Sequence, residues 1–136
     1  MPLIPLLSDD QATPAARAVF DDIRRTRGTD YVNNIWRALA HDPVQLEMTW
    51  AQVKQVMGPG ALDPVVKELI YLAVSTVNNC EYCVHTHTHA ARAKGMTDGM
   101  HAELLRVIAI ASQTNRLAIA LQVPVDERYR VPARGA

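Results

Sequence analysis

The sequence has few aromatic side chains, no excess of charge of either sign and no long apolar run. Aromatic residues make up only 5% of the 136 residues, although 49% of the chain is hydrophobic. The strands of a β-sandwich are enriched in aromatic side chains, whereas abundant Ala, Val, Leu and Ile suit closely packed helices better. The composition therefore predicts an all-α protein.

The balance of charge excludes several classes of partner. Lys and Arg together number 14, and so do Asp and Glu, which gives a formal net charge of zero. Nucleic acids and anionic membranes are bound by basic surfaces, so we expect neither as a partner. No apolar stretch approaches the roughly 18 residues that a transmembrane helix needs. Because a net charge near zero does not oppose self-association, we expect a homo-oligomer.

The first residues, MPLIPLLSDD, do not have the pattern of a secretory signal peptide. They carry no positively charged segment, and Pro2 and Pro5 interrupt the short apolar run. We therefore expect a cytoplasmic protein, in which thiols stay reduced.

Helix start and stop signals recur along the chain and predict six helices. Three of these helices begin where a capping residue precedes a proline, at Thr13-Pro14, Asp42-Pro43 and Asp63-Pro64. The expected helices cover residues 14–27, 30–40, 43–57, 64–77, about 80–94, and 98–121. We expect a single domain over residues 1–136 with its helical core at about 14–121 and a loose tail at 122–136. The fourth to sixth helices are predicted to form most of the core.

Two cysteines and three histidines lie within the twelve residues NNCEYCVHTHTH, at positions 78–89. Cys80 and Cys83 are three residues apart, and on a helix such positions lie about 5–6 Å apart. A disulfide accepts α-carbon separations of roughly 4.4–6.8 Å. The pair also lies at the expected start of a helix, where free amide groups favour a thiolate. In a reducing compartment such a pair indicates redox or metal chemistry.

One imidazole and one carboxylate are placed to assist these thiols. His87 is four residues after Cys83 and therefore on the same helix face, where it could accept the thiol proton. Glu68 is the only acidic residue within the apolar fourth helix. It lies ten residues before the expected break at 78–79 and His87 eight residues after it, or roughly 15 Å and 12 Å of helical rise. An antiparallel hairpin would bring both residues to one level, where Glu68 could orient the imidazole. His85 and His89 point away and are expected on a solvated face.

The spacing of these four residues resembles a family signature. Glu68, Cys80, Cys83 and His87 reproduce the pattern E-x11-C-x2-C-x3-H of the AhpD-like alkylhydroperoxidases, which belong to the carboxymuconolactone decarboxylase superfamily. The similarity extends over about residues 61–100. One position departs from the pattern, because Tyr82 stands where the best-known peroxidase of the family has a histidine.

The resemblance implies a fold, an activity and partners. The fold would be an AhpD-like helical bundle that assembles into trimers or hexamers. The activity would be that of a thiol-dependent peroxidase or disulfide reductase, with Cys83 as the peroxidatic and Cys80 as the resolving cysteine. His87 and Glu68 would form the proton relay. The substrate would be a small hydroperoxide, and an external dithiol such as a protein-bound lipoyl group would return the electrons, so no resident cofactor is expected.

Three alternatives stay open from the residues themselves. Glu68 and His87 could serve a cofactor-free decarboxylase or another acid–base enzyme, with the cysteines as bystanders. Cys80, Cys83 and His87 could bind a metal ion, although structural zinc usually needs a fourth protein ligand. The pair could also act as a redox sensor in an oligomeric protein without efficient turnover.

Overall fold

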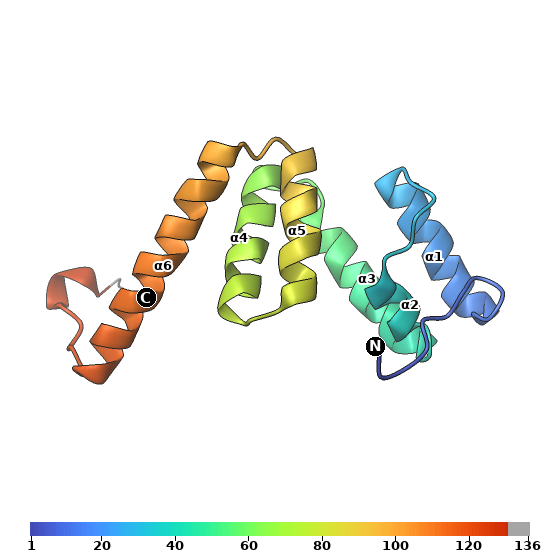
Figure 1. The fold of residues 1–136 in the computed structure, drawn as a ribbon, viewed down its shortest axis with the longest axis horizontal. Helices are drawn as coiled ribbons and strands as arrows, with labels where there is room; N and C mark the ends of the chain where they lie inside the picture. Colours follow the sequence, from blue (N-terminus) through green and yellow to red (C-terminus); the bar gives the residue numbers. More distant parts are fainter. Residues whose placement is uncertain (131–136) are drawn as a thin grey trace, which may run out of the picture. The chain divides into compact units, whose positions relative to one another are not determined.

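The computed structural model describes residues 1–130, which form six α-helices and one short 3-10 helix and contain no strand (Figure 1). The elements are α1 (Pro14–Arg27), α2 (Asn34–Leu39), α3 (Pro43–Met57), α4 (Pro64–Val77), α5 (Glu81–Ala93), α6 (Asp98–Ala120) and η1 (Glu127–Tyr129). The predicted all-α class and the six helices are confirmed. Part of the expected loose tail, residues 131–136, lies outside the described residues. No helix within residues 1–130 combines the length and the apolar character needed to cross a bilayer.

The predicted helix starts are confirmed at all three proline sites. The side chains of Thr13, Asp42 and Asp63 accept hydrogen bonds from backbone amides of the first turns of α1, α3 and α4. Each satisfies amide groups that have no partner within the helix. The second helix is shorter than expected: it begins at Asn34 rather than at residue 30, because the preceding Asn33 is extended (φ −62°, ψ 151°).

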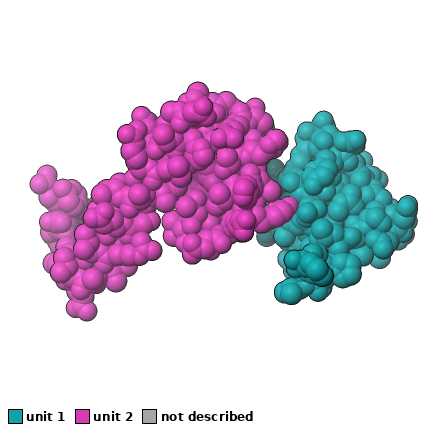
Figure 2. Space-filling model, in the orientation of Figure 1, with its two compact units in different colours: residues 1–61 teal, residues 62–136 magenta. Residues whose placement is uncertain are grey.

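The chain divides into two compact units, residues 1–61 and residues 62–136 (Figure 2). Each unit is described below by itself. The expectation of one domain over the whole chain stays a prediction.

The first unit contains the buried hydrophobic cluster of the structure. α1 and α2 both pack against α3, and the cluster runs from Ala12 to Trp50 with Phe20 and Leu46 fully buried. Trp36 and Trp50 meet edge to face with ring centroids 5.4 Å apart. Such pairs contribute about 0.5–1.5 kcal/mol beyond the burial of their surface.

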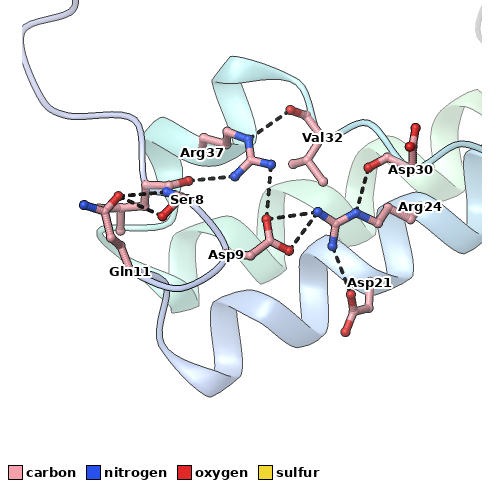
Figure 3. A network of polar contacts seen from close by, with 9 residues as sticks. Ser8, Asp9, Gln11, Asp21, Arg24, Asp30, Val32 and Arg37 are labelled. Carbon is pink, nitrogen blue, oxygen red and sulfur yellow. Dashed lines mark hydrogen bonds and ion pairs between the residues drawn. The ribbon is translucent and has the colours of Figure 1, made fainter.

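Ion pairs connect the N-terminal segment of this unit to its helices (Figure 3). The Asp9 carboxylate lies between two guanidinium groups, 2.8 Å from Arg24 and 3.2 Å from Arg37. Arg37 also donates to the carbonyl oxygen of Leu7 at 2.8 Å. Burial works against the charge on Asp9, but the two arginines hold its pKa below the ordinary value. The cluster is therefore structural.

The second unit is built on a hairpin of α4 and α5, which run antiparallel side by side (Figure 1). Asn79 makes the reversal in the left-handed region (φ 56°), a conformation that asparagine adopts at low cost. The amide of Cys80 then donates to the carbonyl oxygen of Ser75 at 2.9 Å, which closes the turn. The predicted break at residues 78–79 is therefore confirmed. α6 packs against α4.

The prediction that the fourth to sixth helices form most of the core is wrong. Within the described residues, the buried apolar cluster lies between residues 12 and 50, and α6 has no buried residue. Its exposed apolar side chains include Val107, Ile110 and Leu117, each more than half exposed. An apolar stripe on a helix indicates that this face of the helix is buried against another surface, but it does not specify which surface.

Candidate active site

The α4–α5 hairpin brings Glu68 and His87 into direct contact. Nδ1 of His87 lies 2.7 Å from Oε2 of Glu68, which confirms the predicted level match across the turn. Glu68 is only 3% exposed, and the side chain of His87 is 20% exposed. A buried carboxylate is costly unless it is paired, so this contact accounts for an acidic residue inside an apolar helix.

Lys94 is a second partner of Glu68, and the sequence pattern did not point to it. Its Nζ donates to Oε1 of Glu68 at 2.5 Å, so each carboxylate oxygen has a partner of its own. Lys94 follows the last residue of α5 as its C-cap. It comes seven residues after His87, which is close to two helical turns and puts both residues on one face. This spacing is the signal that could have identified it.

Glu68 is an ionised carboxylate in this arrangement. Burial opposes the charge, but hydrogen bonds from His87 and Lys94 and the positive charge of Lys94 hold the pKa of Glu68 below its ordinary value. An ionised carboxylate only accepts hydrogen bonds. In the neutral form of the His87 ring, the proton is therefore on Nδ1, which donates to Glu68, and Nε2 keeps a lone pair that can accept a proton.

Tyr71 is a further contact that the sequence pattern did not reveal. Its ring stacks on that of His87 with centroids 3.6 Å apart and planes inclined by 19°. Tyr71 is three residues after Glu68 on α4, so both side chains can reach the same imidazole. Burial raises the pKa of Tyr71, and negative charge on Cys83, Cys80 or Glu68 would raise it further. The phenol thus stays neutral and limits the movement of the imidazole.

The two cysteines occupy different positions at the start of α5. Cys80 is the N-cap, and its sulfur accepts a hydrogen bond from the amide of Cys83 at 3.4 Å. Cys83 lies within the first turn, and both thiols are free. Burial and the neighbouring Cys80 raise the pKa of Cys83 to about 11. The expectation that the helix start favours a thiolate is therefore wrong for Cys83, because burial disfavours its charged form and the amide hydrogen bond of the cap goes to the sulfur of Cys80.

Among residues 1–130, no hydrogen bond joins His87 to either cysteine, and the catalytic roles of these residues stay a prediction. His85 and His89 are exposed, as predicted. No group of three or more His, Cys, Asp or Glu side chains in this range is arranged to hold a metal ion.

Comparison with known sequences decides the family. The sequence model of the carboxymuconolactone decarboxylase family matches residues 45–126, which is more than half of the chain. The chain belongs to this family. Within it, the chain is AhpD-like: a crystal structure of the alkylhydroperoxidase AhpD core from Rhodospirillum rubrum is 60% identical, with a TM-score of 0.92 over 96% of this chain and 98% of that one.

Curated relatives of this AhpD-like protein are longer. The alkyl hydroperoxide reductase AhpD of Solibacter usitatus is 36% identical over 98 residues, which are 70% of this chain and 54% of the relative. The protein of the same name from Anaeromyxobacter dehalogenans is 29% identical over 102 residues and is matched over 52% of its length. The chain thus spans about half the length of these relatives.

Proposed function

We propose that this AhpD-like protein is a thiol-dependent peroxidase of the alkylhydroperoxidase type or, by the same thiol chemistry, a disulfide reductase, and the peroxidase is the reaction developed below. The observation that carries the proposal is the buried Glu68–His87 pair one helical turn from Cys83. The names of the curated relatives support the same class. Cys83, Cys80, His87 and Glu68 are the proposed catalytic residues.

The proposed reaction begins with proton transfer. His87 accepts the proton of Cys83 on Nε2, and the thiolate attacks one oxygen of the hydroperoxide, which breaks the O–O bond. The leaving alkoxide takes the proton back from His87 and departs as an alcohol, while Cys83 becomes a sulfenic acid. The thiol of Cys80 then displaces water from that sulfur and forms the disulfide. An external dithiol reduces the disulfide by exchange and is itself oxidised.

The high pKa of Cys83 makes a base necessary in this scheme. With a pKa of about 11, very little thiolate is present at neutral pH. The nucleophile must therefore form by proton transfer in the bound complex, where a positioned imidazole contributes typically about 10²–10⁴-fold. Glu68 would orient that imidazole and stabilise its charged form.

The partners of the protein are also part of the proposal. A small hydroperoxide is the substrate, a dithiol or lipoyl-type group is the electron donor, and no resident cofactor or metal is required. We further propose a homo-oligomer, a trimer or hexamer, in which a second copy covers α6. A mostly apolar hollow of about 470 Å³ between α4 and α6, which includes Val74, Val77 and Ile108, supports such a contact. The mass in solution, by light scattering, tests the assembly.

A second candidate function is acid–base catalysis by Glu68 and His87 with both cysteines as bystanders. It is favoured by the raised pKa of Cys83, which keeps this thiol protonated. Turnover of a lactone substrate by a Cys80→Ser/Cys83→Ser double variant would support this function instead of the peroxidase.

Stopped-flow measurement of cumene hydroperoxide consumption, with a dithiol present, tests the peroxidase. The wild-type protein should consume the peroxide, Cys83→Ser should abolish consumption, and His87→Gln should reduce it about 10²-fold or more. His85→Gln is the matched control, because His85 is exposed on the same helix. Equal rates for the wild type and Cys83→Ser would end the proposal.

A further inference from the structure

We propose that Lys94 is a positioning residue that keeps the imidazole of His87 free to accept a proton. The inference rests on the proposed peroxidase function for its catalytic consequence, but its physical basis is the contact geometry of Glu68. Lys94 touches neither cysteine in the described residues and acts through the carboxylate that it shares with His87.

The reason is the charge balance of the three groups Glu68, Lys94 and His87. With Lys94 in place, one buried carboxylate faces one permanent cation, and the site is neutral while His87 is neutral. Without Lys94, the remaining partner of Glu68 within residues 1–130 is His87, and only its imidazolium form would neutralise the carboxylate. A nearby opposite charge favours the charged form of a group. An imidazolium has no lone pair and cannot accept the Cys83 proton. Lys94 thereby keeps Glu68 from holding His87 in the protonated form, in which the imidazole cannot act as a base.

The surroundings leave Lys94 as the cation that can fulfil this role in the described structure. α4 is the element packed against α5 at this level, and its ionisable groups at His87 are Glu68 and the neutral Tyr71. On α5 itself, Cys83 lies one turn before His87, and the other nearby charged or titratable side chains, His85, His89 and Arg92, are exposed. The side chain of Lys94 is 35% exposed, so water screens part of its charge, and its effect should weaken in high salt.

An NMR pH titration of the His87 ring tests the inference without any need for turnover. In Lys94→Gln, which keeps a donor but removes the charge, the midpoint of the His87 titration should rise by about one pH unit. Lys94→Met should give the same rise, and Lys94→Arg should restore the wild-type midpoint. Arg92→Gln, a nearby exposed cation on α5, is the control and should leave the midpoint unchanged. Two neutralising variants guard against one of them failing to fold.

Peroxide consumption by the same variants separates this inference from the proposed function. Lys94→Gln should shift the acid limb of the rate profile upward and reduce the rate at pH 6 about threefold to tenfold, with little loss at pH 8. A shifted midpoint in a protein that consumes no peroxide would refute the peroxidase and leave the role of Lys94 intact. An unmoved midpoint in both neutralising variants, or a shift in Lys94→Arg equal to theirs, would overturn the role of Lys94.

Discussion

Replacement of Cys80 by serine should make Cys83 a faster nucleophile. Burial is the largest cause of the high pKa of Cys83, and the hydrogen bond and charge of Cys80 are the others. Serine keeps an oxygen that can cap α5, but, unlike a thiol, it does not ionise over the pH range in which cysteines titrate. The substitution therefore removes the electrostatic contribution of the neighbour and leaves the burial of Cys83 in place.

The expected gain follows from the size of the shift. A rise in the pKa of Cys83 from 9.0 to about 11 lowers its thiolate fraction at pH 7.5 about a hundredfold. Even if the whole rise in the pKa of Cys83 were reversed, alkylation would not become a hundredfold faster. A more acidic thiol gives a weaker nucleophile, with a Brønsted coefficient of about 0.4–0.5. The ceiling for full reversal is thus about tenfold, and since burial, the largest cause, persists, we expect an increase of about twofold to threefold.

Alkylation by iodoacetamide at pH 7.5, followed by mass spectrometry of the Cys83 peptide, measures this rate. Cys80→Ala serves as the control, because it removes both the charge and the cap. A faster reaction in Cys80→Ala but not in Cys80→Ser would indicate fraying of α5 rather than an electrostatic effect. An unchanged or slower reaction at Cys83 in Cys80→Ser would refute the reasoning.

Two further predictions concern the imidazole and the first unit. Tyr71→Phe keeps the stacked ring and should leave the rate of peroxide consumption within about twofold of the wild-type rate. Tyr71→Ala should lower kcat about threefold to tenfold, because a stacked pair contributes about 0.5–1.5 kcal/mol to holding the His87 ring. Steady-state assays of both variants measure the difference. Asp22 accepts from Trp50 and pairs with Lys54, which lower its pKa to about 2. Its contribution to stability should be fully present above about pH 4 and lost as the pH falls toward 2, so urea denaturation should show Asp22→Asn destabilising the protein at pH 7 but not at pH 2.

The helices and the level of the Glu68–His87 pair could be predicted from sequence because both depend on regular local geometry. A cap followed by proline fixes where a helix begins, as at Asp42, and helical rise fixes how far Glu68 and His87 lie from the turn. Neither needs knowledge of the tertiary structure. The start of α2 was placed too early because Asn33 is a cap in extended conformation, and the residues before it carry no strong break signal.

The contacts of Lys94 and Tyr71 depend on how the hairpin is rotated, and sequence spacing alone does not determine that rotation. Lys94 could equally have extended into solvent from the end of α5, as long charged side chains commonly do. The position of the core was predicted incorrectly for a related reason. The apolar stripe of α6 resembles that of a buried helix, but within the described residues much of it, including Leu117, has no cover.

Two chemical tasks meet at His87, near the middle of α5. The backbone of Lys94 follows the last residue of the helix, but its ammonium group contacts the same carboxylate that contacts His87. The carboxylate–ammonium pair therefore lies at the level of His87, and Cys83 is one helical turn away from that residue. Lys94 sets the charge balance around Glu68, and His87 is the residue through which that balance reaches the thiol of Cys83.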